Sequence, residues 1–456
     1  MNSILKNIGI SIPEILLPAK DIDMTKWSVI ACDQYTSDIN YWRDLKNFIN
    51  ASPSTLNLIY PEVYLESESE SERETRISKI KMNMDKYTDE GIIENIGPGF
   101  ILIDRQTPDT VSRKGLLLSV DLDKYDFSVG SHSLIRATEH TVTDRLPPRI
   151  KIRQNASLEL PHVMLLIDDP KKTIIEALFD VKENFTKVYD FDLSKNGGHV
   201  NGYIINSEEA ILHITTAFAN LAAKENFILK YGVPENTDIL LFAVGDGNHS
   251  LATAKVCWDN IKQDLSDNEI ENHPARYALV EVINIHDRGL QFEPIHRVLF
   301  NVDPYDLIDF IVEDSFNISL DAHCINFVNF EDMKSNLGGL SFDSSSQVVP
   351  YVFDNTAGAI IIKNPENKLA TATLQNILDE YIKLNPKTKI DYIHGEDTVI
   401  KLGNQQGNIG FFLPVIDKSD FFKAIILDGI MPRKTFSMGE ADEKRFYLES
   451  KKIINT

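Results

Sequence analysis

The sequence predicts a mixed α/β protein with more than one domain, organised around a strand, a glycine-rich turn and a helix between Ile239 and Lys255. Three observations support this prediction. Six consecutive apolar residues, Ile239 to Val244, are typical of a strand that is covered on both faces. Gly245 and Gly247 bracket a polar turn, and helix-forming residues follow it. The chain of 456 residues is also too long for one core of ordinary size.

We expect two domains. Residues 1–300 would form an N-terminal α/β domain that carries the Gly-Asp-Gly-Asn-His loop, and residues 301–456 would form a C-terminal α/β domain. Within the second domain, residues 301–390 alternate helix-like and strand-like stretches with few polar groups, which indicates scaffold or a substrate lid. The last segment, about residues 391–436, is expected to return to the site.

Composition narrows the classes of partner. Apolar residues make up 43% of the chain and aromatic residues 9%, which is enough for a buried core. The formal net charge of −22 repels polyanions, so we expect no nucleic-acid partner. The sequence has neither an apolar run that could span a bilayer nor a signal peptide, so we expect no membrane association and a cytoplasmic location. The oligomeric state is not predicted.

The first predicted elements include a group of polar residues. The stretch Trp27–Thr36 predicts a short strand, and Asp38 is placed to cap a helix that continues to Leu45. Asp33, Gln34 and Tyr35 lie at the polar end of this stretch. They are either ligand-binding residues or ordinary residues of a strand end and a turn, and the sequence leaves both interpretations open.

Further strands and one long helix are predicted along the chain. Phe100–Ile103 and Gly115–Val120 predict two strands joined by a hairpin-like connection, and Pro161–Ile167 predicts a buried strand. A helix is predicted from Ser207 to Tyr231, because Ser207 can cap it, apolar residues recur at helical spacing and a glycine follows it.

The strand predicted from Tyr277 to Asn284 ends next to His286 and Asp287. In α/β sheets, ligands gather outside the carboxyl ends of the strands. We therefore expect His286 and Asp287 to share one rim of the sheet with residues 245–249.

The turn after the apolar strand is the strongest candidate for a site. Its glycines allow a sharp bend and close approach of a ligand, and the first amides of the helix need partners. Asn248 or Ser250 is expected to cap the helix. Asp246 and His249 add a carboxylate and an imidazole to a turn that can receive an anion. Ordinary turn composition explains the same residues except His249, and it remains the alternative.

Four segments resemble, in the same order, the motifs of one protein family. Asp246–Ser250 with the following Ala252–Ala254 resembles an Asp-Gly-His-His-Arg box, Glu293–Arg297 a Pro-x-His-Arg segment, Tyr392–His394 a Tyr-x-His segment and Met431–Thr435 a Met-Pro-x-Lys-Ser/Thr segment. Together these segments resemble the bacterial and archaeal family catalogued as domain of unknown function 1015. The resemblance extends along most of the chain and adds His296, His394 and Lys434 to the candidate site. The family's opening has a Pro-Tyr-Asp turn near Asp33, Gln34 and Tyr35, so the resemblance also makes these residues candidates for a second wall of the pocket.

The central box is also similar to the Asp-Gly-x-His-Arg box of the ParB and sulfiredoxin superfamily, in which loop and helix cradle nucleotide phosphates and which includes a free-serine kinase. This chain departs from the pattern, because Asn248 stands in place of the first histidine and Ser250 in place of the arginine. An arginine binds phosphate as a planar, bidentate cation, so another cation must substitute for it. We predict Arg297 and Lys434 for that role. The tail Ser437–Lys444 also departs from the family's Pro-Lys-rich ending.

Basic residues dominate one short stretch of this acidic chain. From residue 136 to residue 153, five basic side chains accompany two acidic ones. They either line the route of an anionic substrate or form ion pairs with acidic groups elsewhere.

We predict an enzyme that binds a phosphorylated small molecule or a nucleotide at residues 245–250 and transfers or hydrolyses a phosphoryl group. Such chemistry needs positioning and charge neutralisation by amides, cations and Mg²⁺. The expected partner is a small anionic substrate, and the expected cofactor is Mg²⁺ with a nucleotide. The expected catalytic residues are Asp246, His249 and His296, and Asp246 is also the expected metal ligand. The expected phosphate- or substrate-binding residues are Gly245, Gly247, Asn248, Ser250, Arg297, His394, Lys434, Asp33 and Tyr35.

Two other functions remain open. A metal-dependent hydrolase would use Asp246, His249, His286, Asp287 and His394, since carboxylates and imidazoles bind such cations. A non-catalytic protein would bind a metabolite through the same loop and would not need the acid–base groups. The sequence names neither the substrate nor the reaction.

Overall fold

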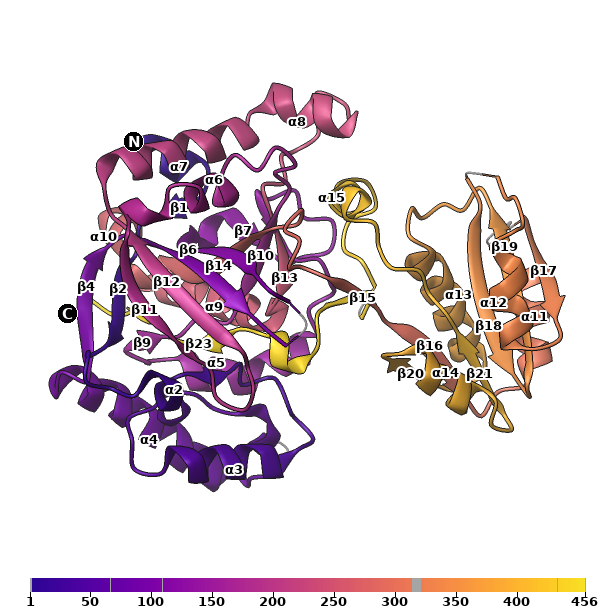
Figure 1. Cartoon of the computed structure of the whole chain (residues 1–456), viewed down its shortest axis with the longest axis horizontal. Coiled ribbons are helices and arrows are strands. Elements are labelled where there is room, and N and C mark those ends of the chain that lie inside the picture. Colours follow the sequence, from indigo (N-terminus) through magenta and orange to yellow (C-terminus); the bar gives the residue numbers. More distant parts are fainter. Residues whose placement is uncertain are drawn as a thin grey trace. The chain divides into compact units, whose positions relative to one another are not determined.

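The computed structural model describes residues 2–65, 67–108, 110–313, 321–343, 345–432 and 434–455. The chain forms two compact units (Figure 1): unit 1 consists of Met1–Gln291 and Met438–Thr456, and unit 2 of Phe292–Ser437. Residues 391–436 thus belong to unit 2, and the segment that rejoins unit 1 is the C-terminal tail that starts at Met438. None of the helices in the described ranges combines the length and the apolar character that a membrane crossing requires.

Unit 1 is built on a ten-stranded mixed sheet, which confirms the predicted mixed α/β class. Helices and strands follow the apolar and polar spacing of the sequence, and β14 has the predicted bounds. Across the sheet the order is β11 (Thr186–Asp192), β12 (His199–Ile205), β5 (Phe100–Gln106), β6 (Arg113–Asp121), β14 (Tyr277–Asn284), β10 (Met164–Ile167), β13 (Phe242–Asp246), β8 (Ile135–Arg136) and β7 (Tyr125–Asp126), and β1 (Ile10–Ser11) pairs with β6.

The apolar run before the glycine-rich turn lies inside this sheet. Phe242, Ala243 and Val244 in β13 are fully buried, because the strand has neighbours on both edges. It pairs antiparallel with β10 and parallel with β8. A continuous apolar strand is the expected result when both faces are covered. The predicted strand is confirmed with shifted bounds, because β13 begins at Phe242 rather than Ile239 and includes Gly245 and Asp246, which were expected in the turn.

The helices of unit 1 surround the sheet, with α7 and α8 along one side and α2, α3 and α4 in a layer of their own (Figure 1). Asp38 caps α3 as predicted, accepting hydrogen bonds from the amides of Asn40 and Tyr41. The helices are α1 (Asn2–Asn7), α2 (Met24–Trp27), α3 (Ile39–Ile49), α4 (Glu70–Asp89), α5 (Leu146–Arg153), α6 (Ile175–Phe179), α7 (Glu208–Leu221), α8 (Lys224–Tyr231), α9 (Asn248–Ile261) and α10 (Asp267–Asn272).

The prediction of one continuous helix from Ser207 to Tyr231 was wrong. The structure has two helices there, α7 and α8, because the backbone of Ala223 is extended and interrupts the helix. Phe227 and Tyr231 are buried on α8. The apolar spacing continues on both sides of the bend, so periodicity alone does not show the break.

The strand ends that were expected to share one rim lie at opposite ends of the sheet. Asp246 of β13 lies opposite Met164 of β10, whereas Asn284 of β14 lies opposite Ile167 at the other end of β10. The prediction was wrong because β13 is antiparallel to β10 while β14 is parallel to it. His286 instead contacts Asp168 at 2.7 Å.

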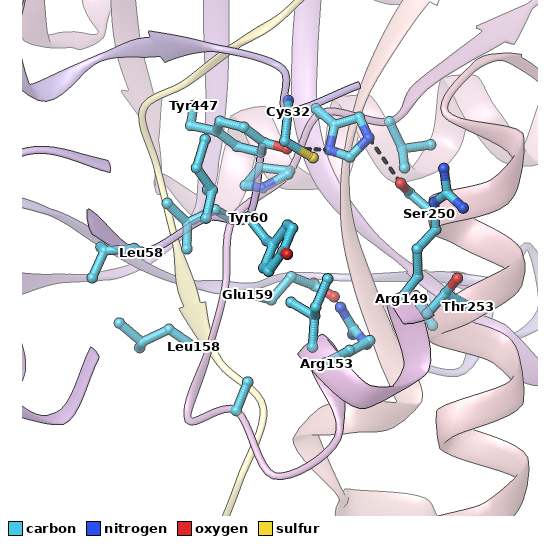
Figure 2. A pocket seen from close by; sticks show the side chains of 18 of the residues that line it. Cys32, Leu58, Tyr60, Arg149, Arg153, Leu158, Glu159, Ser250, Thr253 and Tyr447 are labelled. Atoms are coloured by element: carbon cyan, nitrogen blue, oxygen red, sulfur yellow. Dashed lines mark hydrogen bonds and ion pairs between the residues drawn. The ribbon is translucent and has the colours of Figure 1, made fainter. Parts of the chain in front are cut away.

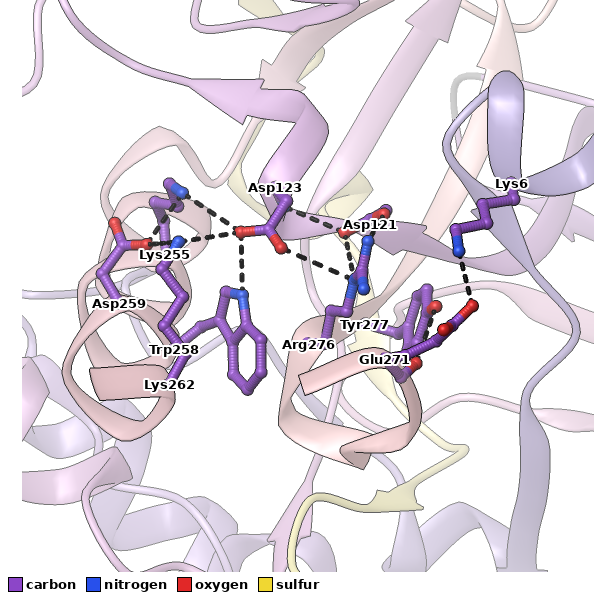
Figure 3. A network of polar contacts seen from close by, with 10 residues as sticks. All are labelled: Lys6, Asp121, Asp123, Lys255, Trp258, Asp259, Lys262, Glu271, Arg276 and Tyr277. Atoms are coloured by element: carbon purple, nitrogen blue, oxygen red, sulfur yellow. Dashed lines mark hydrogen bonds and ion pairs between the residues drawn. The ribbon is translucent and has the colours of Figure 1, made fainter. Parts of the chain in front are cut away.

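A polar network holds the far end of α9 (Figure 3). Asp123, just after β6, accepts hydrogen bonds from Trp258 Nε1 at 3.0 Å and from Lys262 Nζ at 2.9 Å. Arg276 joins the network through Asp121 at 2.7 Å. The carboxylates are partly or fully buried, where such pairs are less screened by salt than on the surface. The network therefore fixes the direction of α9, whose other end is the glycine-rich turn.

Three two-stranded sheets in unit 1 pair segments that are distant in the sequence. Two of them tie the C-terminal tail to the N-terminal part, and Arg445 of the tail is buried between Glu281 at 2.8 Å and Glu449 at 2.7 Å. The pairs are β2 (Glu14–Pro18) with β4 (Ile93–Pro98), β3 (Val29–Ile30) with β23 (Phe446–Tyr447), and β9 (Leu158–Glu159) with β24 (Lys451–Lys452).

Unit 2 is an antiparallel sheet with helices. Its core packs Leu374 and Leu378 of α13 against strand residues such as Tyr351. The strand order is β17 (Asp321–Phe327), β19 (Thr356–Lys363), β18 (Gln347–Phe353), β21 (Asn408–Phe411), β16 (His296–Phe300) and β20 (Lys389–Ile393). The helices are α11 (Pro304–Glu313), α12 (Phe330–Leu337), α13 (Ala370–Leu384), α14 (Glu396–Gly403) and α15 (Lys418–Leu427). A separate pair of short strands joins β15 (Phe292–Pro294) to β22 (Phe436–Met438).

Candidate functional site

The start of α9 has no side-chain cap. Gly247 is the N-cap residue, with a left-handed backbone at φ 84°, so the prediction that Asn248 or Ser250 caps the helix was wrong. Both residues already lie inside the helix, and their side chains point elsewhere. The Oδ1 atom of Asn248 is buried and has no hydrogen-bond partner within the described part of the chain. The first turn of α9 thus lacks the oxygen that usually satisfies its amides.

Gly247 and Gly245 are glycines for different structural reasons. Gly247 needs its left-handed backbone, which other residues rarely adopt. Gly245 is tightly packed, since a Cβ atom there would lie 2.5 Å from Met438 Sδ and 2.9 Å from Leu166 Cγ. The C-terminal tail therefore presses on the turn at Gly245, and packing within unit 1 accounts for that glycine.

Lys444 places a cation beside Asp246. Its Nζ atom lies 3.5 Å from Asp246 Oδ2, and the lysine side chain is 10% exposed. The same cation acts on Asp33. Burial alone would raise the pKa of Asp33, but His162, a hydrogen bond from Gln34 and the charge of Lys444 together hold that pKa below its usual value. Asp33 and Asp246 thus share one buried cation.

A chain of hydrogen bonds runs through His162. Its Nε2 atom lies 2.8 Å from Ser250 Oγ, and its Nδ1 atom lies 2.8 Å from the hydroxyl of Tyr447. Asp33 Oδ2 lies 3.9 Å from the same Nε2 atom. Burial, then the neighbouring Cys32 and Asp33, raise the pKa of the Tyr447 phenol, so Tyr447 stays protonated. Serine, imidazole and phenol therefore form one relay across three separate segments.

His249 makes a different contact. Its Nε2 atom accepts a hydrogen bond from the backbone amide of Val142 at 3.3 Å. An imidazole nitrogen that accepts a hydrogen bond carries no proton, so in the neutral ring the proton lies on Nδ1. His249 is thus arranged to donate a hydrogen bond rather than to act as a base through Nε2.

A pocket of about 150 Å³ opens behind the relay. Figure 2 shows Ser250, Cys32 and Tyr447 at one end, with Leu58 and Leu158 farther along the wall. Most of the remaining lining side chains are apolar. The pocket lies entirely within unit 1.

The basic stretch of residues 136–153 forms ion pairs and hydrogen bonds. Arg149 pairs with Glu62 at 2.5 Å, and Arg153 pairs with Glu159. Arg136 donates to the backbone carbonyl of Ser133 at 2.8 Å. These contacts support the interpretation that the basic side chains pair with other groups of the protein.

The remaining candidates from the sequence are spread over both units. Tyr35 lies in unit 1 beside Asp33, and its ring stacks on Tyr41 at 3.9 Å between centroids. His394 and Lys434 are exposed residues of unit 2. Arg433, which lies in the Met-Pro-x-Lys segment, is outside the described residues.

His296 and Arg297 are buried in unit 2. His296 Nδ1 accepts a hydrogen bond from the amide of Leu413 at 3.0 Å, and burial lowers the pKa of His296 to about 4. Arg297 has no exposed surface, and its guanidinium donates to Gln375 Oε1 at 2.8 Å and to the carbonyl of Ile295 at 2.7 Å. The contacts of both side chains thus support the packing of unit 2.

The geometry does not favour a cluster of metal ligands. Across the described ranges, no group of three or more His, Cys, Asp or Glu side chains is positioned to hold an ion. His286 contacts Asp168 at the opposite end of the sheet from Asp246. A single carboxylate such as Asp246 nevertheless suits Mg²⁺ that arrives with phosphate groups, because Mg²⁺ in such sites takes one or two carboxylates plus substrate oxygens.

Comparison with known proteins supports the resemblance found in the motifs. The family model described as "Protein of unknown function (DUF1015)" matches residues 16–381. The chain belongs to this family. A search of curated proteins found no match for it.

Solved structures with a related arrangement are distant. A free serine kinase in complex with AMP has 9% sequence identity and a TM-score of 0.35, covering 74% of this chain and 91% of its own. A conserved hypothetical protein from Pyrococcus furiosus has 10% identity and a TM-score of 0.33, with 74% and 95% coverage. SbnI from Staphylococcus aureus, with a C-terminal truncation, has 9% identity and a TM-score of 0.33, with 73% and 82% coverage.

Three residues at the site were not found from the sequence: His162, Lys444 and Tyr447. His162 begins the region of a predicted strand, where a single histidine gives no local signal. Lys444 is the last residue of the stretch Ser437–Lys444, which departs from the family's usual ending, and Tyr447 follows three residues later. That departure was the one available indication, because it marked the tail as different without showing where it folds.

Proposed function

We propose that this member of the family is an enzyme that binds the phosphate groups of a nucleotide, or of another phosphorylated small molecule, at the start of α9 and transfers a phosphoryl group from it. The observation that carries the proposal is the position of Lys444, a nearly buried cation between two carboxylates at the uncapped end of a helix. Helix N-termini and lysines both favour phosphate.

The local charge supports a need for Mg²⁺. Asp33 and Asp246 contribute two negative charges and Lys444 one positive charge, so the cluster has a net charge of about −1 at neutral pH. A polyphosphate would add more negative charge and be repelled. Mg²⁺ carried by the nucleotide supplies two positive charges, with Asp246 as its protein ligand and Lys444 released to the phosphate.

The histidines take different roles in this proposal. His249, whose Nε2 atom is engaged by the amide of Val142, donates a hydrogen bond to a phosphate oxygen through Nδ1. His162 is the base, because Asp33, held ionised, lies 3.9 Å from its Nε2 atom and stabilises the imidazolium. No role is proposed for residues of unit 2.

Binding of ATP, ADP, AMP and CTP to the full chain, with and without Mg²⁺, tests the first half of the proposal by calorimetry. Lys444→Gln should weaken the affinity at least about tenfold, the effect of losing one buried charge-assisted hydrogen bond. Lys20→Gln is the matched control, since Lys20 is an exposed lysine of the same unit. Absence of binding at millimolar concentration for every nucleotide would overturn the proposal.

Turnover separates an enzyme from a binding protein. His162→Gln should keep nucleotide affinity and lower the rate of nucleoside diphosphate release by about 10²- to 10⁴-fold, the usual contribution of a positioned base. A wild-type protein that binds Mg²⁺-nucleotide but releases no diphosphate with any acceptor would support the non-catalytic alternative instead.

A further inference from the structure

The pocket behind the relay, which we call the apolar cavity, is a separate feature from the phosphate site. Its walls are aliphatic and aromatic side chains from several segments, among them Leu58, Met84, Leu251 and Leu279. Protein interiors are close-packed, and voids much larger than a water molecule are few. An apolar cavity of about 150 Å³ is large enough to hold a benzene-sized molecule.

The charged side chains of the cavity neutralise one another. Arg149 is paired with Glu62, and Arg153 with Glu159. Burial raises the pKa of Glu62, with Arg149 opposing that effect and Asp33 adding to it. Both arginines among the described lining residues are therefore already paired with a carboxylate. A ligand that enters the cavity must be neutral where it lies against these walls, since burying an unpaired charge is costly.

One end of the cavity is polar, and its hydrogen-bond donors and acceptors have fixed partners. Ser250 Oγ, His162 and Tyr447 line that end, with the backbone amide of Cys32 donating to the Tyr447 hydroxyl at 3.3 Å. With His162 Nδ1–H donating to the second lone pair of that phenolic oxygen, Nε2 is left as an acceptor for the hydroxyl of Ser250. Ser250 Oγ can then accept a hydrogen bond from a hydroxyl in the cavity (Figure 2).

We infer that the apolar cavity is the binding site of the phosphoryl acceptor, and that the acceptor is a neutral alcohol or phenol with a compact apolar body of about one six-membered ring. Its hydroxyl faces Ser250, and its apolar body fills the cavity. The acceptor role rests on the proposed function, whereas binding of the apolar body does not.

The transfer step balances as follows. The acceptor oxygen forms a bond to the terminal phosphorus, and the bond from that phosphorus to the nucleoside diphosphate breaks. The acceptor proton passes to Ser250 Oγ while the Ser250 proton passes to His162 Nε2. The resulting imidazolium lies 3.9 Å from the Asp33 carboxylate, which stabilises it.

Binding without nucleotide tests the cavity by itself. Phenol, toluene and glycerol are titrated into the full chain and followed by ligand-observed NMR. Phenol should bind about fivefold more tightly than toluene, the value of one hydrogen bond, and glycerol should not bind. Ser250→Ala should make phenol and toluene equal. Absence of phenol and toluene binding, or an unchanged preference in Ser250→Ala, would overturn the inference.

Filling the cavity provides a second, steric test. Ala278 lines only this cavity among the pockets described, so Ala278→Leu should weaken phenol binding at least about tenfold. Ala275→Leu is the matched control, since Ala275 is a buried alanine that lines a different pocket. If Ala278→Leu does not fold, Leu160→Phe fills the cavity from a partly exposed position. Phenol affinity equal to wild type in the folded filling variant would contradict the assignment.

The two proposals fail in different ways. Nucleotide binding that depends on Lys444, together with no phenol binding, would leave the proposed function standing and remove this inference. Phenol binding without any nucleotide binding would remove the proposed function and the acceptor role, and it would leave only the binding of an apolar ligand in the cavity. When both bind, a phosphate ester of benzyl alcohol or phenol, detected by mass spectrometry with Mg²⁺-ATP present, is the expected product, and its absence would refute the acceptor role.

Discussion

Mild acid should weaken unit 2 through one buried histidine. His296 is 3% exposed, accepts the amide hydrogen of Leu413, and has a pKa lowered to about 4 by burial, with the charge of Arg297 adding to this effect. In the unfolded chain the ordinary value near 6.5 returns. Above pH 6.5 the ring is neutral in both states, so it adds no pH dependence there.

Between these two values only the unfolded state takes up the proton, so folding loses stability as the pH falls from 6.5 to about 4. At about 1.4 kcal/mol per pH unit, the difference corresponds to a loss of up to about 3 kcal/mol. Below pH 4 the histidine is protonated in both states and the loss levels off. That amount is a large share of the stability of an ordinary domain.

Hydrogen exchange of the amides in β21 and β16 measures this loss locally, after correction for intrinsic exchange rates at each pH. The Leu413 amide, which donates to His296, is the direct reporter. His296→Gln keeps an acceptor but does not titrate, so the acid-induced loss should shrink by about 3 kcal/mol. His323→Gln, at an exposed histidine of the same unit, is the control. An equal pH dependence in wild type and His296→Gln would refute the reasoning.

Three further outcomes follow from the structure of unit 1. Gly247→Ala forces a residue with a Cβ atom to adopt φ 84°, so the free energy of unfolding should fall by about 1–2 kcal/mol and nucleotide binding should weaken, as measured by denaturation and calorimetry; an unchanged value for both would contradict the role of the turn. Arg445→Met leaves Glu281 and Glu449 buried without their cation, so urea denaturation should show a loss of about 3–5 kcal/mol, and a loss near zero would show that the pair is replaceable. Burial and two neighbouring carboxylates raise the pKa of the Cys32 thiol, so iodoacetamide at pH 8 should modify Cys32 only after unfolding, and rapid labelling of the folded chain would disprove this environment.

Local features of the fold were predictable because their causes are local. The apolar run of β13 and the glycines after it predict a buried strand that ends in a turn, and the structure has both. Asp38 caps α3 through its own neighbours, and the mostly apolar run of β14 indicates its bounds. Each of these depends on residues within one turn or one strand, which a single sequence displays directly.

Pairing between distant segments was not predictable. The direction of β13 against β10 decides which polar strand ends come together, and nothing in either strand specifies that direction. The residue before a helix can be a cap by composition, yet a glycine with φ 84° took that position and left Ser250 for another contact. His162 and Tyr447, which complete that contact, are 285 residues apart in the sequence.

The departures of this chain from its family's motifs are related in the structure. An arginine at position 250 would bring a cation to the turn, but the serine there binds His162 and faces an apolar cavity instead. The C-terminal segment, of which Ser437–Lys444 also departs from the family's ending, brings Lys444 to Asp246 and Tyr447 to His162. Position 250, where the family's motif has an arginine, thus belongs to the hydrogen-bonded chain through His162, and the C-terminal segment contributes both Lys444 and Tyr447. Lys444 and Tyr447 come from one segment, so under the proposed function this segment would couple charge neutralisation to proton transfer.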